Sequence, residues 1–149
     1  MAVEKSPASR KVVVTRSFAA SAERVFDAWL DPAAAGLWLF ATPEGKMVRV
    51  EINARVGGKF IITDKRGEML AEHVGTYLEI DRPRRLAFNF SVPQYSAEVT
   101  RVTVEIAPRD QGCELTLTHE GVLPDYHERS IAGWTGILAG LAGCLARVR

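Results

Sequence analysis

The stretch from His119 to His127, HEGVLPDYH, begins like the motif of a zinc protease. That motif needs two histidines one helical turn apart, so that both ring nitrogens reach one metal ion while a glutamate activates water. Here Leu123 stands four residues after His119, and Pro124 would break the helix that has to present the ligands. The three histidines and two cysteines show no other metal-ligand spacing, so we expect no metal ion and no other cofactor.

Other catalytic motifs are missing from the sequence. No Gly-x-Ser-x-Gly elbow is present to hold a nucleophile, and no Gly-x-Gly-x-x-Gly follows a strand-like run. The run Gly57-Gly58-Lys59-Phe60 lacks the leading glycine and the hydroxyl residue of a phosphate loop. A cofactor-independent enzyme that uses His119 and Tyr77 stays open as an alternative, because an imidazole can serve as a general base.

Composition is that of an ordinary globular chain. It has 149 residues, of which 47% are hydrophobic and 25% charged, with a net charge of +1. No basic face indicates nucleic acid as a partner, and no apolar run reaches the ~20 residues of a membrane span. The N-terminal residues lack the apolar region of a signal peptide, and two cysteines fit a reducing compartment, so we expect a cytoplasmic protein.

The order of the predicted elements indicates an α+β fold. Residues 1–10 are interpreted as a flexible leader, and residues 11–149 as a single domain. A β-branched strand over 11–18 precedes a helix capped by Ser21 and a second short helix that Asp31-Pro32 begins. Short strands with turn residues between them fill 48–120 and predict an antiparallel meander. From Pro124 onward, apolar residues recur with helical spacing, so HEGVLPDYH is interpreted as the junction between the last strand and a long helix.

Several segments, in this order, resemble the helix-grip superfamily (START, SRPBCC), and within it the bacterial homologues of the heat-shock protein 90 ATPase activator. They are FAASAERVFDAWLDP at 18–32, VGGKF at 56–60, GTYLEIDRPRRLAF at 75–88, VTVEI at 102–106, LTLTHEG at 115–121 and GW with spaced leucines from 133. The resemblance implies a curved antiparallel sheet of about six or seven strands wrapped around a long C-terminal helix, with two short helices after the first strand. It also implies an apolar cavity between sheet and helix. Relatives bind small hydrophobic molecules, some are cyclases, and the eukaryotic namesake stimulates a chaperone.

Strand alternation predicts which side chains face that cavity. His119 is the one polar residue that the alternation places inward, and it either orients a ligand or bonds to backbone or water. A bulge near Gly75 would reverse the faces of His73 and Tyr77. A filled core fits the same pattern as a hollow one. The predicted ligand-binding residues are Trp38, Phe60, Tyr77, Phe88, Phe90, Val102, Val104, Leu117, His119, Trp134 and Leu138.

The long helix has one uncharged side. No charged residue occurs from Ser130 to Ala146. The side opposite the large apolar residues carries only small residues; the large ones are Ile131, Trp134, Leu138, Leu141 and Leu145. A solvent-facing helix side usually carries charges, and each glycine costs up to ~1 kcal/mol relative to alanine. Either other elements cover this side, or it is exposed in a marginal helix, or it packs against a second copy of the chain. A homodimer would use the face of Gly133, Gly136, Gly140 and Gly143.

Three functions follow, and the first ranks highest. The protein binds a small hydrophobic or aromatic molecule between the sheet and the C-terminal helix. Alternatively, it is a cyclase- or hydratase-type enzyme in the same cavity, or a co-chaperone-like protein-interaction module. The third ranks last because the sequence offers no extended charged surface.

Overall fold

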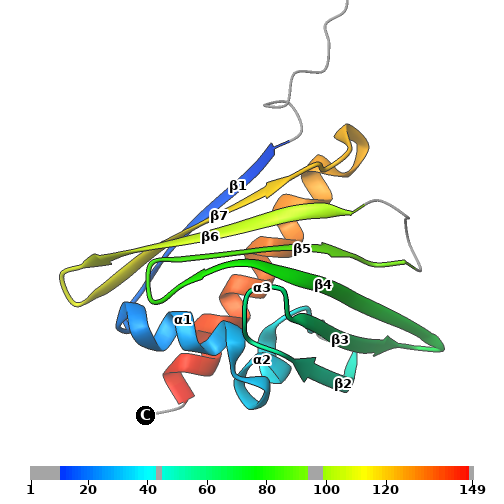
Figure 1. The fold of residues 1–149 in the computed structure, drawn as a ribbon, viewed down its shortest axis with the longest axis horizontal. Coiled ribbons are helices and arrows are strands. Elements are labelled where there is room, and N and C mark those ends of the chain that lie inside the picture. The colour runs from blue at the N-terminus through cyan, green and yellow to red at the C-terminus, as the bar shows by residue number, and fades with distance from the viewer. Residues whose placement is uncertain (1–10, 43–44, 94–98, 148–149) are drawn as a thin grey trace, which may run out of the picture.

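The computed structural model describes residues 11–42, 45–93 and 99–147, so the predicted leader lies outside the described residues. Within these residues, seven strands and three α-helices follow the predicted order, and the short 3-10 helix η2 precedes the last helix (Figure 1). The elements are β1 (Lys11–Phe18), α1 (Ala22–Leu30), α2 (Pro32–Trp38), β2 (Lys46–Ile52), β3 (Lys59–Arg66), β4 (Met69–Asp81), β5 (Arg85–Ser91), β6 (Thr100–Arg109), β7 (Gly112–Glu120), η2 (Pro124–Tyr126) and α3 (His127–Arg147).

The strands form one curved antiparallel sheet in the order β1-β7-β6-β5-β4-β3-β2. Strands β2 to β7 are a meander, and β1 closes the other edge by pairing with β7 from Lys11 opposite Glu120 to Phe18 opposite Cys113. All three α-helices lie on one side of this sheet, and α3 runs across it (Figure 1). The predicted helix-grip architecture is therefore confirmed.

The two short helices begin where the sequence places their caps. The Ser21 side chain accepts a hydrogen bond from the Arg24 amide at 3.1 Å, which satisfies one of the free N–H groups at the start of α1. Asp31 ends α1 and caps α2, since its carboxylate accepts from the Ala33 amide at 3.1 Å while Pro32 occupies the first helical position. One residue thus turns the chain between two helices, of which α1 contacts β6 and β7 and α2 contacts β2.

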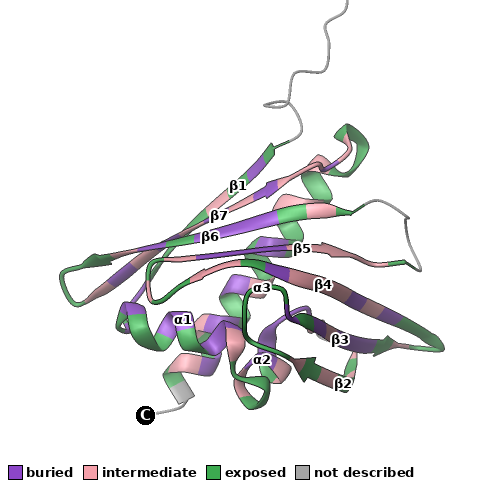
Figure 2. Ribbon diagram, in the orientation of Figure 1, coloured by how far each residue is buried: buried purple, intermediate pink, exposed green. Residues whose placement is uncertain are grey.

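The core lies between the sheet and α3. Trp134, Leu138 and Leu141 of α3 are buried, as the helical spacing predicted, and Cys144 is buried with them. The inward residues of β5, β6 and β7 meet these side chains. Figure 2 shows buried residues concentrated in the central strands and on the sides of the helices that face them. Trp29 of α1 and Trp38 of α2 meet edge to face at 4.8 Å between ring centroids and fill the space beneath the middle of the sheet.

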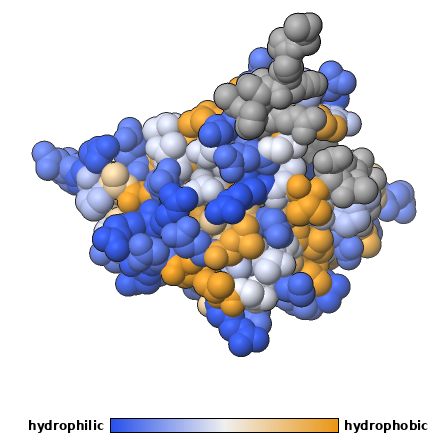
Figure 3. Space-filling model, turned by 45° about the horizontal axis from the view of Figure 1, so that its top comes forward, coloured by the Kyte–Doolittle hydropathy of each residue, from blue (hydrophilic) through white to orange (hydrophobic). Residues whose placement is uncertain are grey.

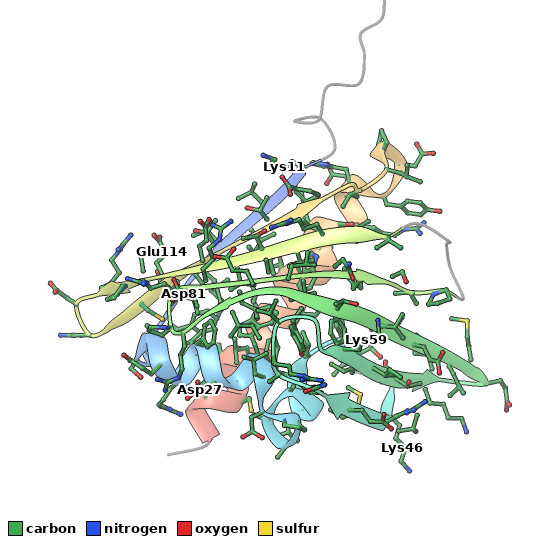
Figure 4. All side chains as sticks on the ribbon, viewed as in Figure 1. Lys11, Asp27, Lys46, Lys59, Asp81 and Glu114 are labelled. Carbon is green, nitrogen blue, oxygen red and sulfur yellow. The ribbon has the colours of Figure 1, made fainter. Side chains whose placement is uncertain are left out.

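The outer face of the sheet carries paired charges. Arg85 bonds Glu79 at 2.9 Å and Glu105 at 2.6 Å, and Arg109 bonds Glu114 at 2.9 Å. Lys11 and Lys46, labelled in Figure 4, lie on the two edge strands. Figure 3 shows hydrophobic patches on one face of the molecule, separated by hydrophilic side chains.

The exposed side of α3 carries small residues. Gly133, Gly136, Gly140 and Gly143 are all exposed, and only Gly140 has a neighbour close to where a Cβ would stand, the Trp38 Cβ at 3.7 Å. Residues Pro124–Ala146 are long and apolar enough to cross a membrane by length and composition alone. The core helix of a soluble domain passes the same test, and Trp134, Leu138 and Leu141 of α3 are buried against the sheet.

Candidate functional site

A pocket of about 560 Å³ opens at the end of the sheet where α3 begins. It lies where β5 ends, β6 starts and β7 leads into η2 (Figure 1). Its apolar lining consists of Phe90, Val92, Val122 and Leu123, and its polar lining of Arg66, Ser91, Thr100, His119, Tyr126, Arg129 and Ser130. Gly121, at φ 91°, turns the chain out of β7 beside the pocket, a conformation that glycine adopts without strain.

A directed chain of hydrogen bonds fixes His119 at the pocket. The Trp134 indole N–H donates to His119 Nδ1 at 3.0 Å, and His119 Nε2 lies 2.7 Å from the Thr100 hydroxyl oxygen. Because an indole can only donate, Nδ1 must be the unprotonated nitrogen, and the network assigns the proton of the neutral ring to Nε2. Nε2–H then donates to Thr100, which donates in turn to the Phe90 carbonyl at 3.3 Å.

Burial keeps His119 neutral. The side chain is 6% exposed, and desolvation of the charged form lowers its pKa to about 4. Both ring nitrogens already have partners from the protein, so His119 would have to give up the Trp134 bond before it accepted a proton from a substrate. The arrangement suits a rigid, neutral wall of a binding site better than a general base.

A second neutral histidine lies behind the pocket on β4. His73 Nδ1 donates to the Ile62 carbonyl at 3.1 Å, and its ring stacks on Phe40 with 4.1 Å between centroids. Burial is the largest cause that lowers its pKa to about 4. Phe40 also lies 5.4 Å from the ring of Phe90, which lines the pocket, and 5.8 Å from that of Trp134.

The backbone at Phe40 is strained. Its φ is 62°, in the left-handed region that a bulky residue rarely adopts. The side chain of Phe40 is buried, and its aromatic contacts hold this backbone conformation in place. Strain of this kind costs on the order of 1–3 kcal/mol and is often found at binding sites.

An ion pair fixes Arg66 at the edge of the pocket. The Asp64 carboxylate is 1% exposed and accepts from Arg66 Nε at 2.9 Å and from the Thr42 hydroxyl at 2.8 Å. Its other oxygen has no hydrogen-bond partner among the described residues. Since a buried carboxylate without its cation is costly, Asp64 keeps the Arg66 guanidinium in place.

The interior beneath the middle of the sheet is nearly full. The space among Trp29, Leu39, Phe60, Tyr77, Leu86 and Phe88 amounts to about 10 Å³, room for roughly one water molecule. Burial also raises the pKa of the Tyr77 phenol. Among the described side chains, the space beside Phe88 is therefore small, and a larger open volume lies at the start of α3.

The eleven predicted ligand-binding residues fall into three groups. Phe90 and His119 line the open pocket, and Phe60, Tyr77 and Phe88 line the small internal space. The remaining six are buried in the core: Trp38, Val102, Val104, Leu117, Trp134 and Leu138. His73 and Tyr77 are both buried on the inward face, as their spacing of four residues requires, and the register shift of β4 lies beyond them, between Tyr77 and Glu79. The ligand-binding roles themselves stay predictions.

The junction between β7 and α3 contributes pocket residues that were not predicted from the sequence. The strand β7 ends at Glu120, and these residues follow it: Val122, Leu123, Tyr126, Arg129 and Ser130. The signal was present, since this stretch was identified as the junction between strand and helix. Among the residues that the structure describes, no cluster of three or more His, Cys, Asp or Glu side chains could hold a metal ion.

Comparisons with known proteins agree with this architecture. The family model described as "Activator of Hsp90 ATPase homolog 1-like protein" matches residues 19–146. A solved structure of a protein from Chromobacterium violaceum is 28% identical, with a TM-score of 0.82, 90% of this chain covered and 96% of that one. An AHSA1-like protein from Aeromonas hydrophila is 23% identical, with a TM-score of 0.80 and coverages of 91% and 92%. A protein from Nitrosomonas europaea is 19% identical, with a TM-score of 0.83 and coverages of 98% and 100%. No curated protein matches the sequence.

Proposed function

This chain belongs to the family of activator of Hsp90 ATPase homolog 1-like proteins, and on that premise we propose that it binds a small hydrophobic or aromatic molecule in the pocket beside His119. Members of this helix-grip family typically bind hydrophobic ligands between the sheet and the C-terminal helix. The proposal places the ligand at the end of that interface where α3 begins.

The observation that carries the proposal is the pocket itself. Its volume of about 560 Å³ lies within the range of about 300–1,000 Å³ that is usual for small-molecule sites. Apolar side chains from β5 and the junction supply its floor, and a few fixed polar groups, Thr100 and His119 among them, supply its walls. This combination suits a ligand with a large apolar body and few polar atoms.

The chemistry of the site favours binding over catalysis. His119 is neutral and bonded through both nitrogens, and burial raises the pKa of Tyr77. An interaction module on the outer sheet face is less favoured, because charges such as Arg85 and Glu105 already neutralise each other there.

The test is a fluorescence titration with N-phenyl-1-naphthylamine, an uncharged apolar probe. Ser130→Trp would fill the pocket from the first turns of α3, and we expect it to weaken probe binding at least about tenfold, because the indole occupies the space that the ligand needs. Glu128→Trp is the matched control, since Glu128 is exposed in the same turn and does not line the pocket. Equal binding by the wild type and Ser130→Trp, or no binding by the wild type, would contradict the proposal.

A further inference from the structure

We propose that the ligand is an amphiphilic anion, with its apolar body in the pocket and a carboxylate or similar group at the arginine rim, which consists of Arg66 and Arg129. This inference rests on the proposed function, because it names the class of molecule that the same pocket takes.

The charged side chains that line the pocket among the described residues are both basic. Among its described lining residues, the two charged side chains are Arg66 and Arg129, and no acidic side chain lines it. Asp64 lies behind Arg66 and offsets the charge of that guanidinium. Within the described lining, Arg129 therefore supplies the positive charge that no carboxylate offsets.

Arg129 has an aromatic neighbour and no carboxylate partner among the described residues. Its guanidinium lies over the Tyr126 ring, 5.4 Å from the centroid, and it makes no ion pair with any residue that the structure describes. A cation over an aromatic face keeps its edge N–H groups available for hydrogen bonds. A planar carboxylate matches such a guanidinium with two parallel bonds.

Arg66 stands at the pocket from a different element, at the end of β3. Its Nε bond to the buried Asp64 fixes the plane of the guanidinium and limits the conformational entropy that ligand binding would cost. An anion at the mouth would thus meet one fixed cation and one cation that an aromatic ring orients.

The floor of the pocket restricts where a ligand can carry charge. Phe90, Val122 and Leu123 are apolar, and His119 is neutral, so an anion placed among them would lose its hydration without gaining a counter-charge. At the rim the anion stays partly hydrated and meets arginine. The ligand is therefore expected to be charged at one end only.

The test compares 2-naphthoate with 2-naphthamide, a neutral molecule of nearly the same shape, by isothermal titration calorimetry at pH 7.5. For the wild type we expect the carboxylate to bind about fivefold or more tightly than the amide. Arg129→Gln should remove most of this preference, measured as the ratio of the carboxylate affinity to the amide affinity. Arg55→Gln is the control, since it removes the same charge from an exposed loop between β2 and β3.

Each outcome decides between the two proposals. If the carboxylate loses affinity in Arg129→Gln and not in Arg55→Gln, the arginine rim is supported. If the wild type binds both molecules equally, or both variants weaken the carboxylate alike, the anionic class is wrong while the apolar pocket stands. If the wild type binds neither molecule, the proposed function and this inference fail together.

Discussion

Two buried neutral histidines should make the protein lose stability in mild acid. Unfolding releases His73 and His119 into water, where their pKa returns from about 4 to about 6.5. Below pH 6.5 the unfolded chain therefore binds protons that the folded protein does not take up, which favours unfolding. The free energy of unfolding is constant above about pH 7, falls as the pH drops from 6.5 to 4, and levels off below 4 as far as these two groups are concerned.

The size of the effect follows from the two pKa values. Each histidine lowers the free energy of unfolding by about 2 kcal/mol between pH 7.5 and 5, and by about 3 kcal/mol once the pH reaches 4. Besides burial, Arg66 lowers and Asp64 raises the pKa of His73, whereas burial alone lowers the pKa of His119. His119 therefore gives the cleaner test.

The perturbation is His119→Gln, assayed by urea denaturation at intervals from pH 7.5 to 5. Glutamine does not titrate, and its amide can accept from Trp134 and donate to Thr100 as the neutral imidazole does. The variant should lose about 2 kcal/mol less than the wild type over this range. Stopping at pH 5 leaves out most carboxylate protonation. A pH dependence identical to that of the wild type would refute the assignment of His119 as a buried neutral group.

Three further predictions concern packing and assembly. In urea titrations, Trp134→Phe should lower the free energy of unfolding by about 2 kcal/mol more than Trp29→Phe, because it leaves His119 Nδ1 without a donor. The Trp29 indole N–H has no partner among the described residues to lose, and equal losses in the two variants would contradict the hydrogen-bond chain. Phe40→Ala should join the pocket to the small internal space and lower the free energy of unfolding by about 3 kcal/mol. Calorimetry should then detect binding of longer alkyl carboxylates than the wild type accepts, and an unchanged length limit would show that Phe40 is no barrier. If the chain is a homodimer through the exposed glycine face of α3, Gly136→Lys should give a folded monomer in sedimentation equilibrium, since a Cβ there meets nothing within 4 Å. A wild type that is monomeric at high concentration would rule the dimer out.

Most of the fold could be predicted because its signals are local. The strand β1 occupies the residues that the β-branched run 11–18 indicated, and Ser21 and Asp31 cap the helices that they were expected to cap. Alternation along β5, β6 and β7 also predicted the inward faces correctly, since successive side chains of a strand must point to opposite sides.

The contacts of the candidate site depend on residues far apart in the chain. Trp134 and Thr100 meet His119 across separations of 15 and 19 residues, and neither pairing has a sequence signal. The strained φ of Phe40 is equally invisible in sequence, because aromatic neighbours from β3, β4, β5 and α3 hold it there. Strand alternation identifies the residues that face inward, and it carries no information on how their volumes combine.

By itself, then, the sequence determined the elements, their order, the antiparallel meander and the inward position of His119, since each depends on neighbours within a few residues. Only the tertiary structure decided that Trp29, Trp38 and Phe88 fill the interior and that the open volume lies at the junction into α3. The physical reason is that a cavity is the difference between the space that the backbone encloses and the volume of all side chains packed into it. That difference is a property of the whole assembled core and of no single segment.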